Sequence, residues 1–274
     1  MSALKFVLRH SPPSAVDVSG LRPAMLAGKS RKEIAQLSLT GWNEVHRVGD
    51  LFAVRGDDAQ RIVIDGADER LVRIGAGLDS GELTVVGAAG DYLGESMRGG
   101  SIVVRGDAGA LIGAGMRGGR IDVSGNVGAF AGSGRAGTLQ GMAGGVIVVR
   151  GNAGDRAADR MRRGLLLIEG NAGDYCASRM LAGTTVVLGR VGIDAGYLMR
   201  RGTLVLGRSP HELLPTFNHN GWHDLLAIRL LLESLAVYGK RFQSFARSRP
   251  SLSRWLGDLG CDGKGEILIA PGRP

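Results

Sequence analysis

The sequence predicts a mainly β protein, a right-handed parallel β-helix of six to seven coils with about 19 residues per coil. Three observations predict it: a nineteen-residue repeat in the middle of the chain, alternating apolar residues at the start of each repeat, and 46 regularly spaced glycines in 274 residues. These observations divide the chain into a mixed α/β cap over 1–60, the β-helix over 61–207 and a helical extension over 208–274.

The repeats align almost without gaps. They are ELTVVGAAGDYLGESMRGG (82–100), SIVVRGDAGALIGAGMRGG (101–119), RIDVSGNVGAFAGSGRAGTLQGMAGG (120–145), VIVVRGNAGDRAADRMRRG (146–164), LLIEGNAGDYCASRMLAG (within 165–183) and TTVVLGRVGIDAGYLMRRG (184–202). The third repeat carries seven extra residues within Gly132–Gln140, which we expect to project from a corner. Residues 61–81 resemble a degenerate first coil, and Thr203–Leu206 begins a truncated seventh.

Each repeat opens with a strand whose second and fourth residues are apolar, which places them on one face. These residues are Leu83 and Val85, Ile102 and Val104, Ile121 and Val123, Ile147 and Val149, and Leu166 and Ile168. A Gly-x-x-Gly corner follows, because paired glycines permit positive φ or close backbone approach. Six methionines at one repeat position should fill the core: Met97, Met116, Met142, Met161, Met180 and Met199.

Nineteen residues are too few for a strand and a full crossover helix, so each strand should pair with its equivalent one coil along. Leucine-rich repeats are the structural alternative, but the glycine corners and the absent Leu-x-x-Leu-x-Leu pattern disfavour them. At roughly 4.8 Å per coil the rod would be about 30 Å long.

The ends of such a rod require caps, since they would otherwise expose unpaired strand edges. On the N-terminal side we expect strands at Lys5–Arg9 and Asp50–Arg55 and a helix at Ala24–Leu37. On the C-terminal side the apolar spacing predicts helices at His223–Tyr238, Phe242–Arg247 and Leu252–Leu259.

Charge favours an anionic partner, because the net charge is +8 and the basic residues are almost all arginine. No nucleic-acid-binding signature accompanies the charge, so an acidic subunit or ligand is the preferred interpretation. We expect no membrane segment, no signal peptide and, with two distant cysteines, a reducing cytoplasmic location.

An arginine stripe is the leading candidate site. Arginines that follow the methionines fall in equivalent loops, so they should align along one side of the rod: Arg98, Arg117, Arg162, Arg163, Arg200 and Arg201. One interpretation is a solvated, solubilising stripe. The other is a track for a polyanion or an acidic subunit, because guanidinium groups bind carboxylates well.

Other polar patterns have structural interpretations. Recurring acids and asparagines beside the corners are expected to bond nearby backbone amides rather than to catalyse: Asp91, Asp155, Asp174, Asn126, Asn152 and Asn171. Ala27–Ser30 lacks the first glycine of a phosphate-binding loop, and His219 and His223 lack a third metal ligand. We therefore predict no catalytic residue and no metal site.

The third strand position should point outward, yet it is mostly apolar. It holds Val103, Val148, Leu167 and Val186, interrupted by Thr84 and Asp122. An apolar column on the outer face predicts coverage by another subunit or by a terminal cap.

The coil pattern Gly-x-x-Gly-x-x-x-Gly-x-x-Met-x-x-Gly, Asp50-Leu51-Phe52 after Val48-Gly49, and Pro215-Thr216-Phe217 resemble the C subunit of formylmethanofuran dehydrogenase. The coils are also similar to the C-terminal domain of the glutamate synthase large subunit, but the resemblance over both caps favours the former. Within the family, the chain is most similar to the C subunit of the formyltransferase/hydrolase complex of methylotrophic bacteria, since its arginine bias fits a GC-rich genome.

This resemblance implies a non-catalytic structural and carrier-binding subunit in tetrahydromethanopterin-linked formaldehyde oxidation to formate. It implies formyltransferase, amidohydrolase-like and dehydrogenase-like partner subunits, no covalent cofactor, and a methanofuran-type carrier whose polyglutamate tail the arginine stripe would hold. The alternatives are the C subunit of a tungsten or molybdenum formylmethanofuran dehydrogenase, a glutamate synthase-like structural module, and a free-standing β-helical lyase or acyltransferase.

Overall fold

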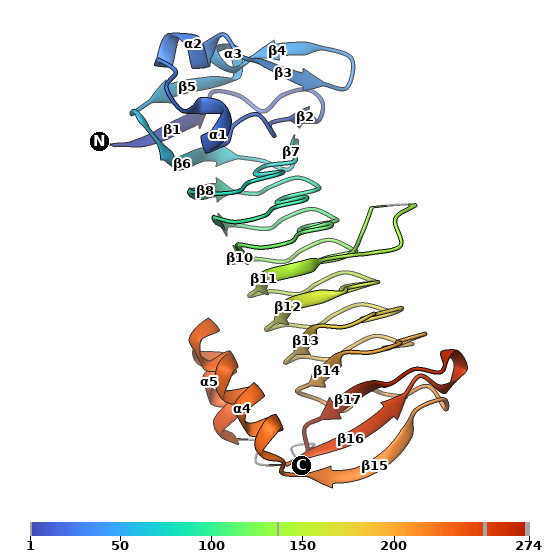
Figure 1. Ribbon diagram of the computed structural model, residues 1–274. Coiled ribbons are helices and arrows are strands. Elements are labelled where there is room, and N and C mark those ends of the chain that lie inside the picture. The colour runs from blue at the N-terminus through green and yellow to red at the C-terminus, as the bar shows by residue number, and fades with distance from the viewer. Residues whose placement is uncertain (1, 136, 249–250, 272–274) are drawn as a thin grey trace.

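The computed structural model describes residues 2–135, 137–248 and 251–271. In these residues the protein is mainly β, with one sheet of 13 strands running along a stack of coils and a second sheet of four strands at the N-terminal end (Figure 1). The few helices lie at the two ends of the chain.

The central strands of the large sheet are parallel, and each pairs with its equivalent one coil along. They are β6 (Asp58–Ala67), β8 (Glu82–Gly87), β9 (Ser101–Arg105), β10 (Arg120–Val123), β11 (Ala143–Val149), β12 (Arg163–Ile168), β13 (Thr184–Val187) and β14 (Thr203–Leu206). Leu165 pairs with Thr184, and Thr184 with Thr203, so the register advances by nineteen residues. The predicted strand pairing is thereby confirmed.

A second column of backbone β-bridges joins successive coils at the glycine corners. It runs from Ala89 through Ala108, Val127, Ala153 and Ala172 to Val191. The interior lies between these columns. The six methionines of the repeats are 0% exposed, as are Ile102, Val104 and Ile121, which confirms the predicted core.

At the N-terminal end, β1 (Ala3–Leu8) pairs parallel with β6 and antiparallel with β5 (Phe52–Arg55). The second sheet contains β2 (Val16–Asp17), β3 (Ser38–Gly41), β4 (Val45–Arg47) and β7 (Leu71–Val72). Lys5–Arg9 is therefore a strand nearly as predicted, whereas the strand predicted at Asp50–Arg55 begins only at Phe52, because α3 (Val48–Leu51) precedes it.

The helix predicted at Ala24–Leu37 is wrong. Two short helices, α1 (Pro23–Leu26) and α2 (Arg31–Ala35), take its place. Gly28 between them adopts φ +75°, and the Ser30 side chain caps α2 in a reciprocal hydrogen-bonded box with Glu33. Local capping thus ends one helix and starts another, and Ser30 acts as a cap rather than in a phosphate loop.

At the C-terminal end, α4 (Leu226–Ser234), the 3₁₀ helix η1 (Leu235–Tyr238) and α5 (Lys240–Ser248) agree with two predicted helices, except that the one predicted from His223 begins only at Leu226. The third, Leu252–Leu259, is wrong: it is strand β16 (Leu252–Gly257), followed by η2 (Leu259–Cys261) and β17 (Gly265–Ile269) and preceded by β15 (Asn218–His223). β17 pairs with the open edge of β14, and β16 pairs with β17. Satisfying that edge overrides the local helical spacing, so the extension is mixed rather than helical.

The helices of this extension cover the outward apolar column. Val148, Leu167, Val186 and Val205 are buried in a second hydrophobic cluster with residues of α4, η1 and α5. Val103, beyond the helices, stays 38% exposed. A terminal segment therefore covers most of the column. Within the described residues, every helix is too short or too polar to span a bilayer.

Candidate functional site

Four of the six stripe arginines occupy one column, immediately after the methionines. The backbone N–H of Arg117 donates to Met97 O at 2.7 Å, that of Arg162 to Met142 O at 2.8 Å, and that of Arg200 to Met180 O at 2.9 Å. Arg98 bonds Leu78 in the same way, while Arg163 and Arg201 follow Arg162 and Arg200 along the chain. The arginines therefore lie on one side of the rod.

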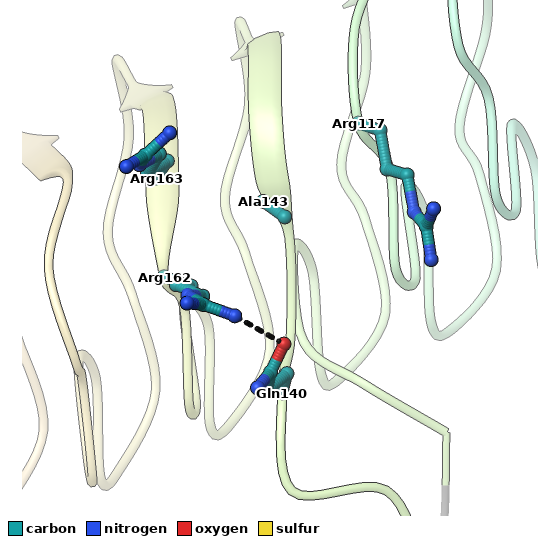
Figure 2. A pocket seen from close by; sticks show the side chains of 5 residues that line it. All are labelled: Arg117, Gln140, Ala143, Arg162 and Arg163. Carbon is teal, nitrogen blue, oxygen red and sulfur yellow. Dashed lines mark hydrogen bonds between the residues drawn. The ribbon is translucent and has the colours of Figure 1, made fainter.

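The column is interrupted, however, because Ala143 and Leu181 take the arginine position in two intervening coils. Figure 2 shows Ala143 between Arg117 and Arg162, with only a methyl group where the neighbouring coils carry guanidinium groups. This small side chain leaves a hollow in the stripe.

Two adjoining hollows result. One, of about 430 Å³, is lined by Arg117, Gln140, Ala143, Arg162 and Arg163. The other, of about 490 Å³, is lined by Ser96, Arg98, Gly115, Arg117, Thr138, Leu139 and Gln140. Arg117 and Gln140 border both, so we treat them together as the arginine groove. Arg200 and Arg201 lie outside its lining, which the repeat alignment alone did not predict.

The inserted residues of the third repeat form the outer wall of this groove. The described part of this segment, residues 133–135 and 137–140, is called the strap below, and it projects from the stack of coils (Figure 1). Arg160 Nη1 donates to Thr138 O at 2.6 Å, and Arg162 Nη1 donates to Gln140 Oε1 at 2.9 Å (Figure 2). Arg162 thus both lines the groove and anchors its wall.

A buried carboxylate holds the other end of the strap. Glu95 is only 3% exposed and forms ion pairs with Arg135 of the strap and, at 3.0 Å, with Arg73. The Arg135 guanidinium also lies over the Tyr92 ring, 5.8 Å from its centroid. Because a buried carboxylate needs its cations, these contacts fix the strap against a coil nearer the N-terminus.

The groove is strongly cationic. Arg98, Arg117, Arg162 and Arg163 are all exposed, and in the described part of the chain none of them forms an ion pair within 4.0 Å. None of the described residues that line either hollow is acidic. Guanidinium groups in this state are available to bind carboxylates or phosphates from outside the chain.

The recurring acids and asparagines form the predicted corner contacts. Asp91 Oδ1 accepts from Ala110 N–H at 2.7 Å, and Asp155 Oδ1 from Asp174 N–H at 2.9 Å. Asn126 and Asn152 accept in the same way from the asparagine backbone of the following coil at 2.9 and 2.8 Å. These side chains link successive coils, which confirms their structural interpretation.

The two candidate histidines have different partners. His219 Nε2 lies 3.1 Å from Ser253 Oγ, and His223 Nε2 lies 2.6 Å from Asn220 O. Among the described residues, no group of three or more His, Cys, Asp or Glu side chains is arranged to hold a metal ion.

One polar cluster was not predicted. Arg150, at the end of β11, donates to Asp122 Oδ2 at 2.9 Å, to Glu169 Oε1 at 2.6 Å and to Tyr238 O at 2.6 Å. It ties two neighbouring coils to η1 and so holds the C-terminal helices on the outer face. The register partners of Arg150 in other coils include Leu188 and Gly207, so the repeats carry no signal for this contact.

The two cysteines should differ sharply in reactivity. Cys176 is 0% exposed, and burial raises its pKa to about 12. Burial also raises the pKa of Cys261, but this side chain is partly exposed. Because the thiolate is the reactive form, iodoacetamide at pH 8 should modify Cys261 slowly and leave Cys176 unmodified until the protein unfolds. Peptide mass spectrometry checks this; equal labelling of both in the folded protein would contradict it.

No family model matches the sequence. Among curated proteins, the C subunit of the tungsten-containing formylmethanofuran dehydrogenase 2 of Methanothermobacter thermautotrophicus is 34% identical over 99 residues, which cover 34% of this chain and 37% of the relative. The C subunit of the formyltransferase/hydrolase complex Fhc of Methylorubrum extorquens is 42% identical over 93 residues, 34% of each chain. These matches thus span about a third of the curated relatives.

The comparison with solved structures extends further. A chain of the formyltransferase/hydrolase complex (FhcABCD) from Methylorubrum extorquens, solved in complex with methylofuran, superposes with a TM-score of 0.92. It is 40% identical, and the match covers 97% of this chain and 99% of that one. Because this identity extends over nearly all of both chains, the protein belongs to the family that contains the C subunits of formylmethanofuran dehydrogenases and of the formyltransferase/hydrolase complex.

Proposed function

We propose that this protein is a non-catalytic, carrier-binding subunit of a formyltransferase/hydrolase complex that acts in tetrahydromethanopterin-linked formaldehyde oxidation to formate, where the complex transfers and hydrolyses the formyl group. Its partners in this proposal are formyltransferase, amidohydrolase-like and dehydrogenase-like subunits. The arginine groove is the observation that carries the proposal, and the solved relative from a complex with methylofuran supports it.

We infer that the stacked coils form a right-handed parallel β-helix over residues 61–207, with caps over 1–60 and 208–274. The nineteen-residue register and the parallel strand pairs support this description. A stack whose coils are joined by two columns of hydrogen bonds is a rigid support, so groups along one side keep fixed spacing.

The ligand of the groove would be the polyglutamate tail of a methanofuran-type carrier. Four exposed guanidinium groups with no acidic neighbour in the lining suit a chain of carboxylates. Holding the tail on a rigid surface confines the formylated end to the neighbourhood of the complex, which raises its effective concentration at both catalytic centres. The chain would thus contribute to catalysis without touching the reacting atoms.

The main alternative is the C subunit of a tungsten or molybdenum formylmethanofuran dehydrogenase, which the 34% identical segment of the archaeal relatives supports. The purified native complex distinguishes the two. Stoichiometric tungsten or molybdenum together with formylmethanofuran oxidation would favour the dehydrogenase, whereas formyl transfer and hydrolysis without either metal would favour the formyltransferase/hydrolase complex.

The groove is tested by replacing Arg98, Arg117 and Arg162 with serine in the assembled complex. Each lost exposed ion contact is worth about 0.5 kcal/mol, so binding of a fluorescent polyglutamate peptide should weaken roughly tenfold at low salt. Isothermal titration calorimetry at several salt concentrations measures this, and the variant should show a shallower salt dependence than the wild type.

A matched control changes the same charge elsewhere. Arg9, Arg55 and Arg208 are exposed arginines outside the groove lining, and their triple serine variant should retain nearly wild-type affinity. Equal weakening in both triple variants would mean that net charge alone causes the effect, and the proposed role of the groove would be wrong. Unchanged affinity in the groove variant would also contradict that role.

A further inference from the structure

Helix α4 has an apolar side that faces solvent. Leu226, Leu230 and Val237 are 70%, 56% and 75% exposed, and their spacing of four and seven residues puts them on one side of α4 and η1. Trp222 and Leu225, just before the helix, are 56% and 46% exposed. These five residues are called the α4 outer face.

The opposite side of the same helix is already packed. Ile228, Leu232 and Leu235 are buried in the cluster that covers the outward strand column. A helix that covers a core needs only one apolar side, yet on the outer side of α4 the exposed Leu226 and Leu230 stand beside the polar Arg229 and Glu233. The α4 outer face is therefore an exposed group of large apolar side chains, as found at interfaces, and its tryptophan is suited to an energetically dominant contact.

Charge restricts what can cover it. Lys240, Arg241 and Arg247 are exposed on α5, which packs beside α4. A two-fold contact through this face would bring both copies of these cations to one interface, which is unfavourable. A partner whose apolar groove is bordered by carboxylates would instead pair with them.

We propose that the α4 outer face docks on another subunit of the complex, one that presents an apolar groove with an acidic border. This inference rests on the complex membership proposed above. It concerns a surface separate from the arginine groove, since α4 and α5 lie on one side of the coils and the strap on the other (Figure 1). The rod would thus contact its partner on one side and leave the groove open on the other.

The test substitutes Leu226, Leu230 and Val237 with serine in the full chain, co-expressed with the other subunits. Affinity for the remaining complex, measured by biolayer interferometry and native mass spectrometry, should fall at least about 100-fold, because three side chains near the centre of an interface would be lost. The matched control is the serine triple variant of Val45, Ile193 and Leu259, which are 72%, 62% and 56% exposed elsewhere; it should assemble normally.

A second variant, Lys240→Glu with Arg247→Glu, tests the acidic border independently of apolar burial. It should weaken assembly roughly tenfold at low salt and less at high salt. Far-ultraviolet circular dichroism of the chain alone should match the wild type for all variants, because every substituted side chain is exposed.

The outcomes separate the two proposals. A wild-type chain that binds no other subunit would overturn the proposed complex membership. A wild-type chain that assembles, with both α4 and α5 variants assembling equally well, would overturn only the docking face. Self-association of the isolated wild-type chain in analytical ultracentrifugation, abolished in the leucine variant, would assign the face to a second copy and would also overturn this inference.

Discussion

Replacing Gly170 with alanine should lower the free energy of unfolding by about 3 kcal/mol, as expected for severe overpacking against the main chain. An added Cβ at Gly170 would lie 2.5 Å from Gly151 O and 2.7 Å from Gly151 C, both of them backbone atoms one coil away. The N–H of Gly170 donates to that same oxygen at 3.0 Å. The alanine would push two coils apart where they are hydrogen-bonded, and urea unfolding followed by circular dichroism measures the loss.

Two glycine controls separate this clash from other effects. At Gly20 an added Cβ meets nothing within 4 Å, so Gly20→Ala should change stability by less than about 0.5 kcal/mol. At Gly28 the space is also open but φ is +75°, so Gly28→Ala should cost only the backbone strain, about 1 kcal/mol. If Gly170→Ala were no worse than Gly28→Ala, coil contact would not be the reason for the glycine.

Replacing Arg150 with alanine should lower the free energy of unfolding by about 3 kcal/mol, because the largely buried Glu169 loses its 2.6 Å partner and keeps only Arg241 at 3.9 Å. Asp122 loses one of two cations, since Arg120 also pairs with it at 2.9 Å. Burial lowers the pKa of Arg150, but its hydrogen bonds to Asp122 and Glu169 outweigh burial, so its pKa is raised overall. The guanidinium is therefore stabilised in its charged form. The Tyr238 carbonyl would also lose its donor, so α4 and α5 should become more accessible to hydrogen exchange.

Arg105 provides the matched control, since it occupies the equivalent strand position two coils away and is exposed. Arg105→Ala should change stability by less than about 0.5 kcal/mol. Arg150→Lys should fall between, because lysine keeps the charge but loses the planar fork that reaches both carboxylates. Equal effects at Arg105 and Arg150 would mean that the cluster adds no stability.

The repeated part of the fold could be predicted because its signals recur. Each coil repeats the apolar alternation, the glycine corner and the methionine, so strands such as β9 and β13 begin at the predicted residues. The ends are different, since each local pattern occurs once. Leu252–Leu259 has helical apolar spacing, yet most of it forms strand β16. The reason is that β17 pairs with the otherwise unpaired edge of β14 and β16 pairs with β17.

The candidate site was only partly predictable for the same reason. Aligned repeats place the arginines on one side of the rod, but they do not show that Ala143 opens a hollow or that the strap closes one side of it. Glu95 and Arg135 meet across 40 residues of sequence through the insertion, which interrupts the repeat. Contacts made by an interruption carry no periodic signal.

The uniform register also determines how a molecule of this kind can change length. Because β12, β13 and β14 meet at the same offset, a segment of nineteen residues can be duplicated or deleted with every strand pair restored. Each such event changes the distance between the two ends of the stack by about 4.8 Å, so the length of the molecule can change only in steps of one coil. The insertion between β10 and β11 leaves their parallel pairing intact. New binding features can therefore be added at a corner without changing the length of the stack.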